Sequence, residues 1–495
     1  MTEVVLLPLF ILLTSLGVAP LIFALSDDSA RLRTTLNLAA AATKLALVAW
    51  LSWKVANGLI YDLRFEMLPG LEFRLQADPL AVLFIALSAV LWLLTTIYAV
   101  GYLEKGAHRS RFFGFFSLCV AATVGVAMAG NLFTFLVFYE LLTLATYPLV
   151  IHRGTAEALR AGRIYLAYTL FGGLMLLFGT LWLWVATGTT DFVPGGVLGD
   201  FATDAPDQAR LLFLVLIVAL GVKAALVPLH AWLPIAMVAP APVSALLHAV
   251  AVVKAGAFGI MRVVYEVFGI EVAVALGVTT PLIALAAVTI LYGSVRALME
   301  DDIKKRLAFS TVSQVSYITL GVALASPIAA IGALAHLIHQ GLMKITMFLA
   351  AGNLAEGLGV KRVSQLDGVG RRLPGTMAAF TLAVLAMIGL PPLAGFVSKW
   401  YLASGALDAD QGWVIALLIG SSLLNALYFL PIVHRGWFGR PAETPETPGR
   451  PRIGWMLAAP PLATAALVLV AGVLANAPFS PIEWTRLIVS REYAE

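Results

Sequence analysis

Two lysines occur inside strongly apolar stretches of this sequence, where a charged side chain is costly. They are Lys223 and Lys399, and each lies beside a helix-breaking segment: Pro228 follows the first, and Pro391-Pro392 precedes the second. A charge at the centre of a membrane helix costs about 2.5–3.5 kcal/mol on insertion scales. Either proline site alone is explained by an ordinary kink, but broken helices at matching positions are typical of transport sites. The two lysines together therefore predict a protein that moves ions.

A single acid, Glu140, lies in another apolar stretch, and no other charged residue occurs between Phe133 and Leu142. An acid in hydrocarbon needs a cationic partner or a proton. Lys223 is the obvious partner, because a nearby carboxylate would hold the lysine charged and its withdrawal would favour release of the proton. Such a pair would form a switch. The alternative is a static ion pair that fixes the packing of two helices.

Histidines and lysines recur together in two further apolar stretches. His248 and Lys254 are six residues apart, while His336, His339 and Lys344 lie within nine residues of one another. Residues three and eight positions apart share roughly one helix face, and histidine titrates near neutral pH. These patterns predict a hydrated proton path. Zinc ligation by the two histidines of the second stretch is the alternative, but no nearby cysteine or acid offers a third ligand.

In sequence order these residues describe a route across the membrane plane, from Glu140 through Lys223, Lys254 and Lys344 to Lys399. Lys44 lies outside this route, and we interpret it as a structural lysine or one that extends its charge to the membrane surface. His434 is either an exit group for protons or an ordinary interfacial residue.

The composition determines the class of protein. Of the 495 residues, 60% are hydrophobic and only 12% are charged, and the mean hydropathy is +0.92, whereas soluble domains carry about 25% charged residues. The sequence therefore predicts an all-α polytopic membrane protein. The single cysteine, Cys119, excludes an internal disulfide and a multi-cysteine iron–sulfur or zinc site. No dinucleotide fingerprint or phosphate-binding loop occurs, so no cofactor is predicted, and the net charge of +4 does not imply nucleic acid.

Apolar runs of about 20 residues predict about fourteen transmembrane helices. The first is too long and too loosely bounded for a cleavable signal peptide, so we expect a retained helix. The predicted helices are centred near residues 14, 45, 90, 120, 140, 175, 222, 253, 287, 314, 341, 388, 423 and 466.

The basic residues of the loops predict an orientation. Loops after odd-numbered helices hold twenty lysines and arginines, from Arg31 to Arg452, whereas loops after even-numbered helices hold four: Lys54, Arg64, Arg74 and Arg210. Because cytoplasmic loops are enriched in lysine and arginine, the odd-numbered loops are predicted to be cytoplasmic. Both termini are then outside, and the chain is predicted to be a multi-pass protein of the cell inner (plasma) membrane.

The helices are predicted to form two inverted five-helix repeats. Residues 1–110 would hold helices 1–3, residues 111–270 the first repeat (helices 4–8), residues 271–436 the second repeat (helices 9–13), and residues 437–495 a loop, helix 14 and a short tail. Lys223 and Lys399 then fall in the fourth helix of each repeat. An odd number of helices per repeat inverts the second repeat, and discontinuous helices 7 and 12 would frame the transport site.

Several ordered motifs between residues 75 and 436 resemble the antiporter-like subunits shared by respiratory complex I, membrane-bound hydrogenases and Mrp-type multisubunit sodium/proton antiporters. The matching stretches are 139–141 (Tyr-Glu-Leu), 221–223 (Gly-Val-Lys), 230–234 (His-Ala-Trp-Leu-Pro), 239–248 (Ala-Pro-Ala-Pro-Val-Ser-Ala-Leu-Leu-His), 302–314 (from Asp302 to Gln314) and 389–396 (Gly-Leu-Pro-Pro-Leu-Ala-Gly-Phe).

This resemblance implies a role for each residue of the route. Glu140 and Lys223 would be the coupled pair, Lys254 or His248 a relay, His336 and Lys344 the central relay, and Lys399 the terminal lysine. It also implies a fourteen-helix core with two inverted repeats. Such subunits have no catalytic chemistry of their own and work beside other membrane subunits within the lipid bilayer.

The sequence departs from the family pattern at three points. Many relatives place a histidine four residues before the lysine of the eleventh helix, where this chain has Gln340 and carries His339 one position earlier. Some complex I relatives place a glutamate where this chain has Lys399. The chain ends about twenty residues after the fourteenth predicted helix, so we expect a core-only subunit, similar in size to the D-type Mrp subunit or to the middle subunits of complex I.

Three functions remain after these arguments. The favoured one is an ion-translocating subunit of a monovalent cation (Na+)/proton antiporter, because of the size of the chain and Lys399. The alternative is a proton-pumping membrane-arm subunit of a complex I-type NADH:quinone oxidoreductase or a hydrogenase, with redox centres on other chains. The second alternative is a scaffold subunit that conducts no ions. Protons are the ions predicted to move along this route. No cluster of acids and backbone carbonyls stands out as a Na+ site, so a metal cation such as Na+ would cross elsewhere in the complex.

Overall fold

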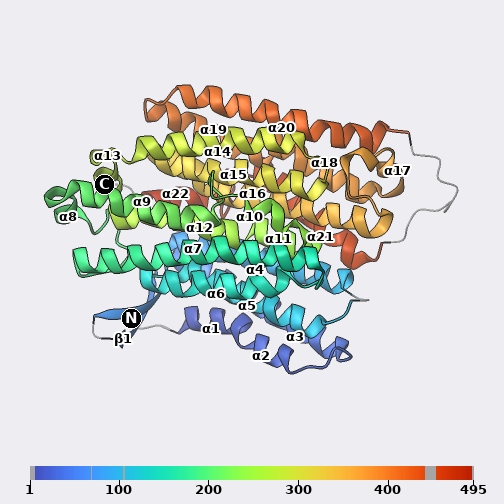
Figure 1. Cartoon of the computed structure of the whole chain (residues 1–495), viewed down its shortest axis with the longest axis horizontal. Coiled ribbons are helices and arrows are strands. Elements are labelled where there is room, and N and C mark those ends of the chain that lie inside the picture. Colours follow the sequence, from blue (N-terminus) through green and yellow to red (C-terminus); the bar gives the residue numbers. More distant parts are fainter. Residues whose placement is uncertain (1–5, 69, 104–105, 441–452, 493–495) are drawn as a thin grey trace.

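The computed structural model describes residues 6–68, 70–103, 106–440 and 453–492, and it is a bundle of helices that run along one long axis (Figure 1). Ten helical segments in the described ranges, one of them the interrupted stretch Ala241–Phe268, are long and apolar enough to cross a membrane. The prediction of a helical multi-pass membrane protein is therefore confirmed. The described helices include every predicted centre, although the count of fourteen membrane crossings and the inverted repeat remain predictions.

The N-terminal part contains four helices and one β-hairpin. Asp78 caps the last of these helices, because its carboxylate accepts a hydrogen bond from the backbone N–H of Ala81 at 2.6 Å. The elements are α1 (Leu7–Leu16), α2 (Val18–Phe23), α3 (Ala30–Ala56), β1 (Tyr61–Leu68), β2 (Leu71–Ala77) and α4 (Pro79–Tyr102).

The next part contains long membrane helices and several short ones. Asn131 and Thr155 cap the helices α6 and α7 through their side-chain oxygens. The elements are α5 (Arg109–Met128), α6 (Leu132–Val150), α7 (Ala156–Thr187), α8 (Gly199–Asp204), α9 (Pro206–Lys223), α10 (Trp232–Ile235), η1 (Ala236–Val238), α11 (Ala241–Ala249), α12 (Val252–Arg262), the π-helix η2 (Val263–Phe268) and α13 (Ile270–Ala275).

The third part surrounds α16, the helix at its centre. Nearly every residue of α16 between Ala329 and Leu354 is buried, and this helix packs against α11, α15, α18, α19 and α21. A helix that is buried on all sides lies inside a bundle. The elements are α14 (Thr279–Met299), α15 (Ile303–Ala323), α16 (Pro327–Leu358), η3 (Val363–Gln365), α17 (Val369–Arg372), α18 (Pro374–Ile388), α19 (Ala394–Asp408), α20 (Trp413–Phe438), α21 (Trp455–Val473) and α22 (Pro481–Glu492).

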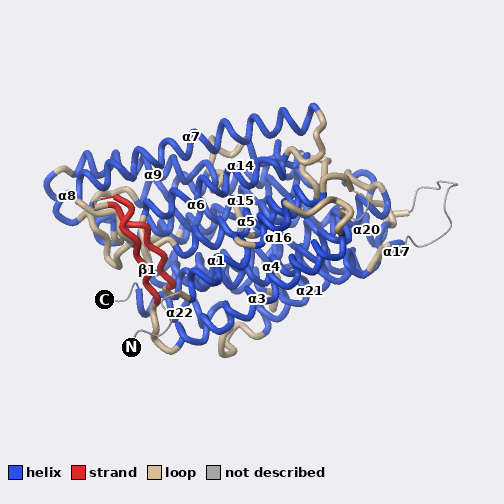
Figure 2. The backbone as a smooth tube through the Cα atoms, turned by 90° about the horizontal axis from the view of Figure 1, so that it is seen from below, coloured by secondary structure: helices blue, strands red, loops and turns tan. Residues whose placement is uncertain are grey.

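Loops of the same predicted side meet at the same end of the bundle. At one end, which we call the hairpin end, Gly130 donates to the carbonyl of Arg74 at 2.9 Å, and Val193 donates to that of Glu266 at 3.1 Å. At the other, the basic end, Ile303 donates to the carbonyl of Lys361 at 3.0 Å. The strands, α8 and α13 lie at the hairpin end and α17 lies at the basic end (Figures 1 and 2).

The apolar runs of the sequence do not indicate the β-hairpin. Its two strands pair in antiparallel fashion and lie beside the helix ends (Figure 2). Arg74 on β2 donates to Asp62 at 2.9 Å and to Asp191 at 3.0 Å. Although partial burial opposes the effect, hydrogen bonds from Arg74 and Arg64 hold the pKa of the Asp62 carboxyl below its ordinary value. These ion pairs fasten the hairpin to the loop before α8.

Both predicted helix breaks are present, and a third break accompanies them. Residues 224–231 separate α9 from α10, and residues 389–393 separate α18 from α19. The third break lies at Val250 and Ala251, between α11 and α12, where the backbone leaves the helical region with ψ of −91° at Ala251. The single eighth helix of the sequence-based prediction is therefore two helices. No proline or glycine marks this site, so local sequence offered no sign of it.

Candidate functional site

Lys223 is the last residue of α9 and is completely buried. Its ammonium donates a hydrogen bond to the backbone carbonyl of Tyr139 and lies 3.3 Å from the centre of the Tyr139 ring. Aromatic faces attract cations. The Lys223 side chain is therefore held against α6, at the residue that precedes Glu140.

Glu140 and Lys223 lie close enough to interact electrostatically. Among the described residues, however, no ion pair within 4.0 Å joins the two side chains, and Oε1 of Glu140 has no hydrogen-bond partner. The structure brings the predicted pair together without the direct contact that a static ion pair requires. The Glu140 carboxylate packs instead against Gly173 of α7, where a Cβ atom would overlap it.

This close approach allows the position of Glu140 to be changed without changing its charge. The change Gly173→Ala would push the carboxylate away from α7, and we expect it to reduce proton transport to about a tenth of the wild-type rate if the position of this acid matters. The measurement is ion-driven proton movement in vesicles that contain the whole complex. Gly179→Ala is the matched control, because its Cβ would approach the flexible end of Leu216 at 2.6 Å instead. Equal transport by both variants would contradict a role for the placement of Glu140.

His248 and Lys254 lie on either side of the third break, on α11 and α12. Both side chains are completely buried, and neither ring nitrogen of His248 nor the ammonium of Lys254 has a hydrogen-bond partner among the described residues. At Gly256, α12 lies so close to the end of α9 that a Cβ atom would overlap the backbone nitrogen of Ala224. This contact places α12, the helix that carries Lys254, against the helix end that carries Lys223.

His336 and Lys344 both lie on α16 and make separate sets of contacts. Nδ1 of His336 lies 2.9 Å from Oγ of Ser398, and its ring stacks on Tyr317 with centroids 5.2 Å apart. Lys344 donates to the carbonyl of Leu307 at 3.0 Å and to the hydroxyl of Ser310, both on α15. The two residues are eight positions apart, or about 12 Å along the helix. The predicted central relay therefore consists of two separate positions along α16.

His339 and Gln340 are buried on α16, between His336 and Lys344. Neither ring nitrogen of His339 has a hydrogen-bond partner in the described part of the chain, and the same is true of the Gln340 amide. Buried polar groups normally have partners. Both side chains therefore have unused hydrogen-bonding capacity next to the predicted route.

Lys399 lies at the break between α18 and α19. Its ammonium donates to the carbonyls of Met387 and Ile388, both at 3.0 Å, and to the hydroxyl of Ser422 at 2.8 Å. The last carbonyls of a helix lack intrahelical partners and carry partial negative charge. The helix break therefore supplies the acceptors for this lysine. Lys223, by contrast, precedes its break and binds a carbonyl of another helix.

The helices that carry these residues pack in an unbroken order. α6 packs on α7, α7 on α9, α9 on α12, α12 on α15, α15 on α16, and α16 on α11 and α19. Lys254 interacts electrostatically with both Lys344 and His336, and His336 also interacts with Lys399. We call the eight predicted residues the buried row: Glu140, Lys223, His248, Lys254, His336, His339, Lys344 and Lys399.

A buried ionic cluster near the row was not predicted. Arg262 pairs with Asp78 at 2.8 Å and with Glu266 at 2.5 Å, and all three side chains are almost completely buried. The arginine and the glutamate are four residues apart in an otherwise apolar stretch, which is a signal that sequence reasoning could have used. The serines that bind the row, among them Ser310, Ser398 and Ser422, carry no comparable signal. In the described ranges, no group of three or more His, Cys, Asp or Glu residues could hold a metal ion.

A row of buried basic and acidic side chains inside a multi-pass helical bundle defines an antiporter-like membrane subunit. Residues 129–425 match the family described as "NADH:quinone oxidoreductase/Mrp antiporter, TM", and the chain belongs to this family. The resemblance predicted from the motifs is thereby confirmed, and the chain is a membrane-arm subunit of the antiporter-like type.

Relatives in different kinds of complex share this fold and sequence. The chain is 38% identical to the N subunit of NADH-quinone oxidoreductase from Desulforudis audaxviator, over 78% of each chain. It is 29% identical to the D subunit of the Na(+)/H(+) antiporter from Bacillus subtilis, over 75% of each chain. The A/B subunit of a probable K(+)/H(+) antiporter from Rhizobium meliloti is 32% identical over 88% of this chain, which spans only 44% of that longer relative.

Solved structures superpose on nearly the whole of this chain. A chain of the Mrp complex from Dietzia sp. DQ12-45-1b superposes with a TM-score of 0.87 and 26% identity, covering 99% of this chain and 98% of that one. A chain of respiratory complex I from Thermus thermophilus gives a TM-score of 0.82 and 25% identity, covering 99% of each. Both are multisubunit complexes, consistent with the prediction that this chain works beside other membrane subunits.

Proposed function

We propose that this chain is the ion-translocating subunit of a multisubunit monovalent cation (Na+)/proton antiporter and that protons move along the buried row. The observation that carries the proposal is the continuous packing, from α6 to α19, of the helices that carry the buried ionisable residues from Glu140 to Lys399. Ionisable groups at membrane depth are costly and are typical of ion and proton pathways. The similarity to the Bacillus subtilis antiporter protein and to the Dietzia complex supports the antiporter assignment.

The geometry suggests how the row would work. A buried lysine holds or releases its proton according to the charges and acceptors around it. Lys223 has an acid close by but not in contact, so a small movement of either helix changes the field at its ammonium. Lys399 donates to three acceptors at the helix break, so its ammonium has hydrogen-bond partners at the far end of the row. Lys223 is therefore the proposed switch, and Lys399 the proposed terminal donor or acceptor.

The change Glu140→Gln tests this switch. It keeps the shape of the side chain but removes the charge that acts on Lys223, and we expect proton transport to fall to about a tenth of the wild-type rate while the complex still assembles. The measurement is collapse of a pH gradient by Na+ in everted vesicles that contain the whole complex. Asp207→Asn is the control, because this acid is 93% exposed on the same helix as Lys223. Normal transport by the glutamine variant would refute the switch.

The second candidate is a proton-pumping subunit of a complex I-type NADH:quinone oxidoreductase. The 38% identity with the N subunit of the Desulforudis enzyme favours it, because this relative is part of a redox complex. The row would serve both functions, since coupling to redox chemistry would reside in other chains. Purification of the native complex in mild detergent decides between them. Small membrane proteins as the only partners would support the antiporter, and co-purifying flavin or iron–sulfur proteins would support the redox complex.

A further inference from the structure

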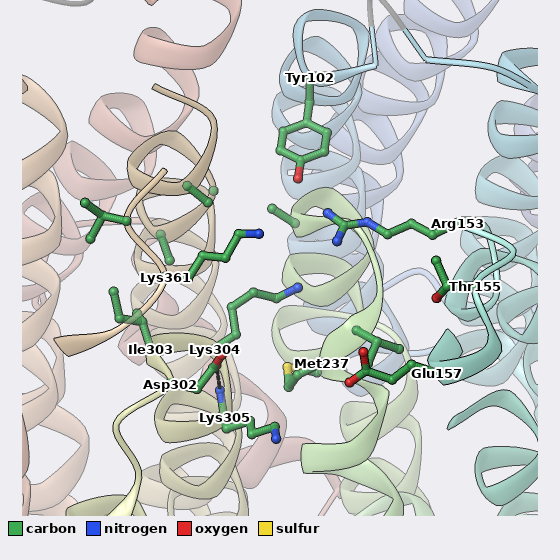
Figure 3. Close-up of a pocket in the computed structure, with 16 residues that line it drawn as sticks. Tyr102, Arg153, Thr155, Glu157, Met237, Asp302, Ile303, Lys304, Lys305 and Lys361 are labelled. Carbon is green, nitrogen blue, oxygen red and sulfur yellow. Dashed lines mark hydrogen bonds between the residues drawn. The ribbon is translucent and has the colours of Figure 1, made fainter. Parts of the chain in front are cut away.

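A cavity of about 310 Å³ opens at the basic end of the bundle, apart from the buried row. It lies between the ends of α4, α7, α11, α15 and α16 (Figure 3). One water molecule occupies about 30 Å³ in the liquid, so the cavity is large enough for a polyatomic ion. Its chemistry is determined by the side chains that surround it.

Basic side chains converge on this cavity. In Figure 3 the guanidinium of Arg153 and the ammonium groups of Lys304 and Lys361 point toward a common space, with the hydroxyl of Tyr102 above them. Lys304 donates to the carbonyl of Ala239 at 2.5 Å. In the described part of the chain, no ion pair within 4.0 Å joins any of the three cations to a carboxylate. Their charges are available to an anion.

The acids in the cavity wall do not cancel these charges. Four basic residues line the cavity, because Lys305 joins the three cations, against two acids, Glu157 and Asp302. The carboxylate of Asp302 is engaged as the cap of α15, where it accepts from the backbone N–H of Lys305 at 2.9 Å. Basic residues therefore outnumber acidic residues in the cavity wall.

Three helices also begin at the wall of the cavity. Thr155 caps α7, Ala241 is the first residue of α11, and Ile303 is the first residue of α15; all three residues line the space. The N-terminus of a helix carries partial positive charge, which favours anions. The backbone and the side chains thus favour the same kind of ligand.

We propose that this cavity binds a phosphate group, with Arg153, Lys304 and Lys361 as its ligands. Arginine binds phosphate oxygens through two parallel hydrogen bonds, and lysine acts as a point charge. The group belongs either to an anionic phospholipid or to a free phosphate ion. Basic pockets between membrane helices on the cytoplasmic side bind lipid headgroups of this kind.

The location gives the site a function that rests on the proton path proposed above. Ala241 and Gly352 line the cavity, on α11 and α16, the two helices that carry His248 and Lys344. The ring of Phe348, one turn from Gly352, stacks on His248 with centroids 4.5 Å apart. His248 also interacts electrostatically with Lys304. A bound phosphate group would therefore change the electric field at this end of the row and regulate proton transport.

The test measures binding separately from transport. The whole complex is titrated with phosphatidylglycerol, phosphatidylcholine or inorganic phosphate, and bound molecules are counted by native mass spectrometry. The double variant Arg153→Gln/Lys361→Gln is compared with Arg371→Gln/Arg372→Gln, which removes two basic residues at the same end but outside the cavity. We expect the first variant to weaken binding of phosphatidylglycerol or phosphate at least tenfold and the second to leave it unchanged.

Each outcome has one meaning. Loss of phosphatidylglycerol binding alone identifies a lipid headgroup, and loss of phosphate binding identifies a free anion. Equal binding by the wild type and both variants, or equal losses in both variants, would overturn the site. If the Arg153→Gln/Lys361→Gln variant lost binding but transported protons normally, the site would be real but would not regulate transport. If the row proved to carry no protons, the binding measurement would still test the site.

Discussion

Replacing Lys223 by arginine is expected to lower ion-driven proton transport by about a hundredfold, although the positive charge is kept. Arginine remains protonated at any pH that a protein tolerates, so it can hold a charge but cannot pass a proton. The buried ammonium of Lys223 now contacts the carbonyl and ring of Tyr139. If the lysine served only to hold α9 against α6, the guanidinium would preserve most of this attraction and transport would continue.

A second buried lysine provides the control for this experiment. Lys44 is also completely buried, donates to Ser15 at 2.5 Å and lies over the ring of Trp92. It is outside the row, so Lys44→Met is expected to leave transport largely intact in the assembled complex, because an apolar side chain of similar volume often replaces a buried charge without loss. Assembly is checked for both variants by the size of the complex and the proteins it contains. Active transport by Lys223→Arg would rule out proton transfer at this lysine.

Replacing Lys399 by methionine is expected to have an effect of similar size, about a hundredfold. Among the described residues, Lys399 is the only ionisable group that contacts the end carbonyls of α18, at Met387 and Ile388. Without it, α19 carries no member of the row next to His336, which contacts this helix at Ser398. Transport is measured in the same vesicles, with the assembled complex quantified in each preparation. The scaffold interpretation predicts the opposite, namely normal transport in both lysine variants.

The change Ser422→Ala is the matched control for Lys399. It removes one of three acceptors but leaves the lysine and both carbonyls in place. We expect a loss of no more than about threefold, corresponding to less than about 1 kcal/mol for one hydrogen bond. If Ser422→Ala were as damaging as Lys399→Met, the hydroxyl itself would have to carry the proton. If neither change reduced transport, the row would not end at this lysine.

Some parts of the fold were predictable because they depend on local pattern. Apolar runs of membrane length predict the positions of the helices, and proline or glycine predicts the breaks after Lys223 and before Lys399. The break at Val250 was not predictable in this way. It depends on how α11 and α12 pack within the bundle, where α11 meets α16 and α12 meets α9.

The buried row likewise has features that the sequence predicts and features that depend on the folded structure. Its members were found because each is a polar residue in an apolar stretch, and this signal is independent of the fold. The same rule applies to Arg262 and Glu266, which also lie in an apolar stretch but were not among the predicted residues. Their partner Asp78 precedes another helix, so only the folded chain reveals the cluster.

The class of protein, its family, the helix positions and the polar residues that make up the row are all readable from the sequence, since hydropathy and charge are properties of single residues and short segments. The contacts of each residue are not, because they depend on how the helices pack. The folded chain keeps the carboxylate of Glu140 out of direct contact with Lys223, gives Lys399 the end carbonyls of α18 as acceptors, and brings Arg153, Lys304 and Lys361 to one cavity. Contacts between residues far apart in the chain depend on helix packing, which local pattern does not specify.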